Sequence, residues 1–306
     1  ASVLAKLVRQ LVQDLNADYA LDIVLVDDCS KDGSAKVCEH LHQEFPHSVS
    51  CFALSKNVGE HNAVMAGLNQ TRGDIVVIMD DDFQNPVQEV KTLVTEIIKG
   101  RYDVVYSFYD QKHHPWFRNW GSAFNNRVAN FMLNKPKDLY LSSFKALNRF
   151  LVNEIIKYDL PFPYIDGLIL RTTENIGRVK VSHQSRRTGK SGYTLPKLAS
   201  LWLNMFTNFS ILPLRISIIL GFIFSAVGLI LGAFTLIEKI LIPDLPIGWA
   251  ALIVSIATFS GVQLVAIGMI GEYVGRTFLS QNRKPQYTIR EAQVRTPSPD
   301  EAPASL

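Results

Sequence analysis

The chain has 306 residues, 47% of them hydrophobic, and its formal net charge is +3. This length and hydrophobic content allow one soluble domain of ordinary size together with a further segment. A net charge this small excludes a protein that binds polyanions over its whole surface, so no nucleic-acid partner is expected. The three cysteines, Cys29, Cys38 and Cys51, lack metal-ligand spacing and are too few for a disulfide framework, which indicates a reducing compartment.

The start of the chain shows no basic, apolar and cleavage regions in the order of a secretory signal. Apolar residues from Val3 to Leu15 recur at helical spacing, so a helix is expected over about 2–16. Because the chain opens inside this helix without an initiating Met, we expect a preceding segment of the protein.

Residues up to about 110 alternate between strand and helix patterns. Strands are expected at 21–28, 49–54, 74–80 and 103–108, and helices at 33–44, 61–70 and about 87–98. Continuous apolar strands that alternate with helices indicate an α/β fold, with a mostly parallel sheet covered by helices on both faces. Sites in such sheets form at the carboxyl ends of the strands, where Asp27-Asp28 and Asp80-Asp81-Asp82 fall.

The acidic triplet Asp80-Asp81-Asp82 directly follows an apolar, β-branched run. Like charges side by side repel, so the triplet is either a solvated turn or the place of a bound cation. Hard oxygen ligands suit Mg²⁺ or Mn²⁺, and Mg²⁺ commonly uses few carboxylates together with substrate phosphates. The triplet alone leaves both interpretations open. No GxxxxGK(S/T) or GxGxxG motif follows a strand, which argues against the usual NTPase and dinucleotide sites.

Residues 110–210 are less regular and richer in basic and aromatic residues, and 183–198 is a basic loop with glycines. Apolar residues from Leu195 to Phe209 then follow a helical period. This pattern predicts a helix lying on a membrane surface over 194–211, with a buried amphipathic helix as the alternative. The apolar segments that follow favour the membrane.

Two uncharged apolar runs, 216–237 and 248–271, predict a transmembrane hairpin within 212–276. The first run spans roughly 33 Å as a helix, enough for a hydrocarbon core of about 30 Å. The connecting loop holds Glu238 and Asp244 against one lysine, and the outer flanks hold Arg215, Arg276, Arg283, Lys284 and Arg290. The positive-inside rule then places both flanks in the cytoplasm of a multi-pass membrane protein. Residues 277–306 are expected there too, with a disordered tail from about 291 that is rich in Pro, Ser and charge.

A set of motifs now resembles the polyprenyl-phosphate glycosyltransferases, which are inverting enzymes of glycosyltransferase family 2 with a GT-A fold. The motifs are VDDCSKDGS (26–34), NVGEHNAVMAG (57–67), MDDDFQNP (79–86), GKSGY (189–193) and GEYVGR (271–276). The resemblance covers nearly the whole chain, including the hairpin. It implies a cytoplasmic GT-A catalytic domain over 1–193, anchored in the bacterial inner (plasma) membrane. By analogy with relatives that form tetramers, it also implies a homo-oligomer.

The resemblance implies a reaction in which one sugar passes from a nucleotide sugar, expected to be UDP-linked, to undecaprenyl phosphate. Inversion at the anomeric carbon would give a lipid-linked monosaccharide for envelope glycan modification. Asp28 would contact the donor nucleoside, and Asp80 the donor sugar or ribose. Asp82 and Gln84 would ligate Mg²⁺ or Mn²⁺ on the diphosphate.

The acceptor phosphate would be bound by a loop whose residues match the family in part. They are Arg186, Arg187, Lys190, Ser191 and Tyr193. Arg187 and Lys190 depart from the commoner residues but add positive charge, which suits a phosphate near a membrane surface. Attraction of the loop to anionic headgroups remains an alternative.

The chain departs from the family pattern in other places. Many relatives carry Gly-Asp-Phe-Arg where this chain has SSFK (142–145), so Ser143 stands at the position of a proposed catalytic aspartate. Asp138 is the expected substitute, which makes Asp80, Asp82 and Asp138 the candidate catalytic residues. The family also opens with a strand whose end helps to hold the nucleotide base, and this chain starts after it. A protein that lacks this strand is expected to bind the donor poorly.

Two other functions compete with this interpretation. A processive polysaccharide synthase is disfavoured because the chain has no QxxRW motif around Arg118 and Trp120. A non-catalytic nucleotide-sugar-binding scaffold or flippase partner is compatible with Ser143. The presence of Asp28, Asp80, Asp82 and Gln84 together favours the enzyme.

Overall fold

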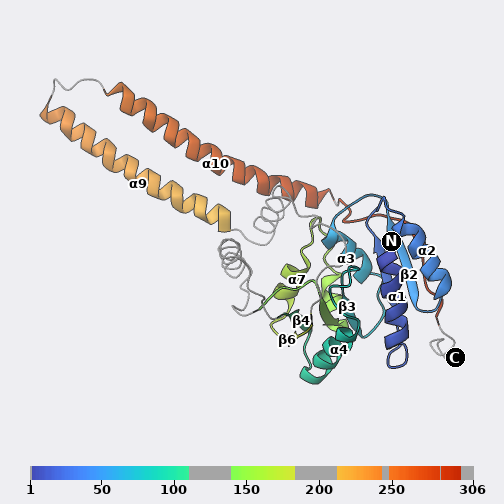
Figure 1. Ribbon diagram of the computed structural model, residues 1–306. Coiled ribbons are helices and arrows are strands. Elements are labelled where there is room, and N and C mark those ends of the chain that lie inside the picture. The colour runs from blue at the N-terminus through green and yellow to red at the C-terminus, as the bar shows by residue number, and fades with distance from the viewer. Residues whose placement is uncertain (1, 110–138, 183–211, 243–247, 283, 298–306) are drawn as a thin grey trace, which may run out of the picture. The chain divides into compact units, whose positions relative to one another are not determined.

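The computed structural model describes residues 2–109, 139–182, 212–242, 248–282 and 284–297 (Figure 1). The chain divides into two units, one formed by Ala1–Tyr193 with Lys284–Leu306 and the other by Thr194–Arg283. The expected alternation of helices and strands in the first 110 residues is confirmed. The elements there are α1 (Ser2–Leu15), β1 (Ile23–Asp27), α2 (Ser34–Glu44), β2 (Val49–Leu54), α3 (Glu60–Leu68), β3 (Ile75–Ile78), α4 (Gln88–Gly100) and β4 (Val104–Phe108).

The first unit continues with elements that the sequence did not predict. They are β5 (Lys145–Asn148), α6 (Arg149–Ile155), α7 (Ile165–Thr172), β6 (Ile176–Lys180) and β7 (Ile289–Gln293). The strands form one sheet in the order β1-β2-β7 and a second sheet in the order β3-β5-β4-β6. The α/β class is therefore confirmed.

The prediction of a mostly parallel sheet is wrong. The pairs β1–β2 and β4–β6 are parallel, whereas β2–β7, β3–β5 and β4–β5 are antiparallel. The reason is that β5 enters between β3 and β4 after a long connection and runs against both of them. Antiparallel neighbours need no helical crossover, so the helix–strand alternation of the first 110 residues does not reveal this strand.

Helix α4 covers one face of the four-stranded sheet. Its side chains Val90, Leu93, Val94 and Ile97 are buried in one cluster with Val105 of β4, Ala146 of β5 and Phe144, which directly precedes β5. Their spacing of three and four residues places them on one helix face. Helix α1 contributes Leu7 and Leu15 to this cluster, and Leu4 and Val8 to a second cluster with α2 and β2. It therefore packs against the cores of both sheets.

The prediction of a disordered tail from about residue 291 is wrong for residues 291–297. Strand β7 pairs with β2, and the Arg295 guanidinium forms an ion pair with Asp22. The three central residues of β7, Arg290 to Ala292, are exposed in an otherwise half-buried strand. A polar composition is typical of an edge strand as well as of disorder, so composition alone does not distinguish them.

The second unit contains the long helices α9 (Leu212–Leu241) and α10 (Trp249–Gln281). They pack antiparallel, because the Ser217 hydroxyl lies 3.4 Å from the Met269 sulfur and the Phe224 and Phe259 rings meet edge to face. Among the described residues, one stretch is long and apolar enough to cross a membrane, Leu214–Thr235. The second span stays a prediction, as does the surface helix over 194–211, which lies outside the described residues.

Candidate functional site

The carboxylates expected at the site follow the carboxyl ends of two strands in the first unit. Asp28 comes directly after β1, and Asp80 follows two residues after the end of β3. Strand β1 belongs to the three-stranded sheet and β3 to the four-stranded sheet. The candidate site therefore draws residues from both sheets.

The Asp28 carboxylate holds the loop in front of α3. One of its oxygens accepts a hydrogen bond from the backbone N–H of Val58 at 2.7 Å, and the other accepts from Gly59 at 2.9 Å. The Asn57 side chain donates to the Asp28 carbonyl at 3.1 Å. Gly59 is the N-cap of α3 with φ of 88°, a conformation that favours glycine. Whatever else Asp28 contacts, it shapes this loop.

The acidic turn after β3 is fixed at both ends. Met79 and Phe83 pack against the hydrophobic cluster under α4, and Phe83 adopts φ of 59°. The buried Asn85 accepts a hydrogen bond from the Tyr109 hydroxyl at 2.8 Å. Between these anchors, Asp82 accepts the backbone N–H of Gln84 at 3.0 Å, which is an Asx turn.

This geometry answers how consecutive aspartates are tolerated. Asp80 and Asp81 are exposed and Asp82 is half-buried, so water solvates much of their charge. In the described part of the chain, no three His, Cys, Asp or Glu side chains gather in a group that could hold a metal ion. Asp82 and Gln84 carry carboxylate and amide oxygens, which are the kind of ligand that Mg²⁺ and Mn²⁺ prefer.

Ser143 is hydrogen-bonded to Asp80, a contact that the sequence did not predict. Its hydroxyl donates to the Asp80 carboxylate at 2.7 Å. The register explains the contact, because β5 pairs Lys145 with Ile78, and two residues further along the antiparallel register Ser143 lies opposite Asp80. Next to it, the buried hydroxyl groups of Ser107 and Ser142 hydrogen-bond each other at 2.8 Å. This hydrogen bond helps to hold the backbone segment that carries Ser143 in place.

A buried ion pair lies beside this segment, and sequence reasoning missed it. The Lys145 ammonium contacts the Asp166 carboxylate, and the two side chains are 4% and 12% exposed. The Tyr106 hydroxyl donates to the same carboxylate at 2.8 Å. Burial, followed by the charge of Asp166, raises the pKa of Tyr106. Because 21 residues separate the two charges in the sequence, no spacing rule signals the pair.

The neighbouring helix α3 presents His61 to this buried region. The His61 ring meets the Tyr164 ring edge to face, with the ring centroids 5.0 Å apart. Burial lowers the pKa of His61, and the opposing charges of Glu60 and Asp166 raise it by less. His61 is therefore neutral near pH 7.

Comparison with known proteins identifies the family. A model of glycosyl transferase family 2 matches residues 1–156. The chain belongs to this family. Curated relatives of this glycosyltransferase include undecaprenyl-phosphate 4-deoxy-4-formamido-L-arabinose transferases. The one from Pseudomonas fluorescens is 32% identical over 299 residues, covering 94% of this chain and 84% of the relative. The one from Proteus mirabilis is 29% identical over 284 residues, covering 91% and 85%. The resemblance to the polyprenyl-phosphate branch of the family is thereby confirmed.

Solved structures give weaker similarities to this glycosyltransferase. Glucosyl-3-phosphoglycerate synthase from Mycobacterium tuberculosis is 18% identical with a TM-score of 0.45, covering 67% of this chain and 71% of the other. TarS from S. aureus is 18% identical with a TM-score of 0.43, covering 67% and 64%.

Several expected site residues of this glycosyltransferase lie outside the described residues. They are Asp138 and the acceptor-loop residues Arg186, Arg187, Lys190, Ser191 and Tyr193. Their roles stay predictions. The residues that the structure does place at the candidate site are Asp28, Asp80, Asp82, Gln84 and Ser143.

Proposed function

We propose that this chain transfers a single sugar from a UDP-sugar to undecaprenyl phosphate and inverts the anomeric configuration. The product would be a lipid-linked monosaccharide for envelope glycan modification. The observation that carries this proposal is the similarity to undecaprenyl-phosphate transferases over 94% of the chain, which extends well beyond the matched family domain. The GT-A fold is part of the same proposal, supported by the mixed α/β architecture.

The acidic turn would receive the donor diphosphate. Asp82 and Gln84 would hold Mg²⁺ or Mn²⁺ together with diphosphate oxygens, and the cation would supply stabilisation of the leaving UDP. Asp80 would contact the donor sugar or ribose, with its carboxylate oriented by the hydrogen bond from Ser143. Asp28 would shape the nucleoside pocket through the Asn57–Gly59 loop.

The acceptor side requires positioning more than a base. A phosphate monoester has its second pKa at about 6 and is mostly dianionic at pH 7. Its oxygen would attack the anomeric carbon as the bond from that carbon to the UDP oxygen breaks, and no proton needs to leave the nucleophile. A serine at position 143 is therefore compatible with transfer. The basic loop from Arg186 to Lys190 would hold the acceptor phosphate.

Strand pairing supports the proposed membrane arrangement. Strand β7 lies after α9 and α10 in the sequence, yet it pairs with β2, which precedes both helices. The two strands must therefore be on the same side of any membrane that the chain crosses. If Leu214–Thr235 crosses a bilayer, a second crossing has to return the chain, and α10 is the helix available for it. This supports a two-span hairpin with both flanks on the same side of the membrane. The positive-inside rule places that side in the cytoplasm, and the similarity to undecaprenyl-phosphate transferases supports the bacterial inner membrane.

A label-transfer assay tests the proposal. Full-length protein in detergent would be incubated with undecaprenyl phosphate, Mg²⁺ or Mn²⁺, and a panel of UDP-, GDP- and dTDP-sugars that includes UDP-4-deoxy-4-formamido-L-arabinose. We expect label from one UDP-sugar to enter the organic phase. Asp82→Asn should abolish transfer, whereas Asp81→Asn, an exposed neighbour, should retain most of it. Binding of UDP without transfer from any donor would instead favour a non-catalytic scaffold.

A further inference from the structure

The candidate site depends on how two separate sheets are held together. Asp28 follows β1 in one sheet, and the acidic turn follows β3 in the other. Among the described residues, no strand of one sheet is hydrogen-bonded to a strand of the other. The separation of Asp28 from Asp82 is therefore set by contacts other than strand pairing.

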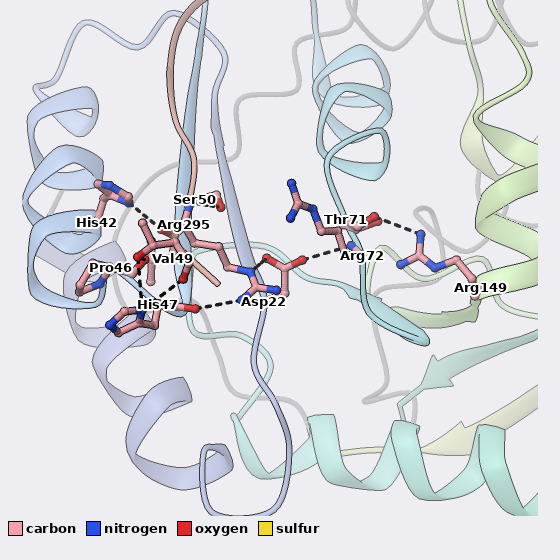
Figure 2. Close-up of polar contacts among 11 residues, drawn as sticks. Asp22, His42, Pro46, His47, Val49, Ser50, Thr71, Arg72, Arg149 and Arg295 are labelled. Atoms are coloured by element: carbon pink, nitrogen blue, oxygen red, sulfur yellow. Dashed lines mark hydrogen bonds and ion pairs between the residues drawn. The ribbon is translucent and has the colours of Figure 1, made fainter. Parts of the chain in front are cut away.

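A group of polar contacts joins the sheets at the opposite ends of these strands (Figure 2). Asp22, directly before β1, accepts the backbone N–H of Arg72 at 3.1 Å, in the turn that leads into β3. Arg149, the first residue of α6, donates to the carbonyl of Thr71 at 3.1 Å and to the carbonyl of Gly73 at 2.8 Å. The turn 71–73 is thus held from the β1 side and from the β5 side.

Arg295 fixes the carboxylate that makes the first of these contacts. Its Nε donates to the other oxygen of Asp22 at 3.1 Å, and the two side chains are 8% and 11% exposed. Its Nη1 donates to the carbonyl of His47 at 3.1 Å, and its backbone N–H donates to the Ser50 hydroxyl at 3.0 Å. Figure 2 shows Arg295 lying between the end of α2 and Asp22, which in turn faces Arg72.

We propose that Arg295 and Asp22 are positioning residues for the nucleotide donor. Together they set the spacing of β1 and β3, and with it the placement of Asp28 relative to the acidic turn. Arg295 follows α9 and α10 in the sequence, yet it thereby controls donor binding at the ends of β1 and β3, which precede both helices. Without the guanidinium, the Asp22 carboxylate loses the partner that fixes its orientation, so the oxygen that accepts the Arg72 N–H is no longer held in place. The inference rests on the proposed function for the identity of the donor.

The first test compares two arginines of the same chain end in full-length protein in detergent. Arg295→Met removes the buried pair, whereas Arg290→Met removes an exposed side chain of β7 that donates to the Ser55 carbonyl at 3.4 Å. UDP affinity is measured by calorimetry in the presence of Mg²⁺. We expect UDP to bind about tenfold more weakly to Arg295→Met, the loss typical of one hydrogen bond to a charged group, and within about twofold of wild type to Arg290→Met.

A double variant separates positioning from bulk stability. Asp22→Leu with Arg295→Met replaces the ion pair by apolar side chains, which restores much of the melting temperature but leaves the Arg72 N–H without its acceptor. We expect the double variant to bind UDP as weakly as Arg295→Met does. In both variants, amide hydrogen exchange over residues 71–79 should be faster than in wild type. Recovery of UDP affinity together with the melting temperature would overturn the proposal, as would unchanged affinity in Arg295→Met.

The two proposals fail in different ways. If wild-type protein binds no UDP and transfers no sugar, the proposed function is wrong. Amide hydrogen exchange over residues 71–79 still tests whether Arg295 couples the two sheets, because this measurement needs no nucleotide. Equal exchange in wild type and Arg295→Met would show that Arg295 does not hold the turn in front of β3.

Discussion

Substitutions of Asp28 distinguish two roles for this residue, direct binding of the donor and shaping of the loop in front of α3. Its carboxylate accepts two backbone N–H groups, from Val58 at 2.7 Å and Gly59 at 2.9 Å. A hydrogen bond to a charged group contributes about 1.5–3 kcal/mol, and the half-exposed position of Asp28 favours the lower end. Asp28→Ala removes both bonds and should cost about 3 kcal/mol. Asp28→Asn keeps one acceptor oxygen and should cost about 1.5 kcal/mol.

Thermal unfolding in mild detergent, followed by intrinsic fluorescence, measures this loss alongside UDP affinity by calorimetry. At roughly 2–4 °C per kcal/mol for a unit of this size, the alanine variant should melt about 6–12 °C lower and the asparagine variant about half as much. Asp32→Asn is the matched control from the same motif, because its carboxylate accepts hydrogen bonds from the backbone N–H and the hydroxyl of nearby Ser34. An Asp28→Asn variant that melts like wild type but binds no UDP would refute the reasoning, since Asp28 would then act only as a direct ligand.

Other residues give independent tests. Lys145→Met leaves the Asp166 carboxylate buried without its cationic partner and should destabilise the protein by about 3–5 kcal/mol. Lys157→Met, at an exposed ion pair, should cost under about 1 kcal/mol. Similar melting temperatures for the two variants would contradict this expectation. Burial depresses the pKa of His61, so as the pH falls the unfolded chain takes up this proton before the folded protein does. The contribution of neutral His61 to the free energy of unfolding is therefore fully present above about pH 6.5 and is lost as the pH falls further. His61→Phe should flatten that acid-side slope in melting curves collected between pH 5 and 7, and an unchanged slope would exclude His61 as its source. Gly59→Ala should cost about 1–3 kcal/mol through its positive φ alone, since no atom lies within 4 Å of the added methyl group; a smaller shift in melting temperature would mean that the loop relaxes.

Much of the first unit could be predicted from the sequence because its strands are continuous apolar runs. The four strands expected before residue 110 are present as β1 to β4, and the carboxylates of Asp28 and Asp80–Asp82 follow strand ends as that pattern requires. Strand β5 could not be found in the same way, because it has only four residues and its sequence, KALN, is not a continuous apolar run. Its antiparallel insertion turned the expected parallel sheet into a mixed one.

The contacts within the site depend on register, which the sequence does not reveal. The hydrogen bond from Ser143 to Asp80 exists because Lys145 pairs with Ile78. From the motif alone, Ser143 indicates only that the family aspartate is absent at this position. Its role as a partner of Asp80 required knowing which residue of β3 it faces.

Strand β7 shows why composition misled the prediction for the C-terminal segment. The strand it covers, β2, is buried at all but one of its residues, and an unpaired edge of that kind would offer its backbone groups to other chains. The exposed residues of β7, Arg290 to Ala292, instead form a charged outer edge that does not invite further pairing. The charge that suggested disorder is thus what an edge strand needs on its solvent side. Since β7 is encoded after α9 and α10, the three-stranded sheet stays incomplete until both helices have been synthesised. The open edge of β2 is therefore covered only after β7 has been synthesised.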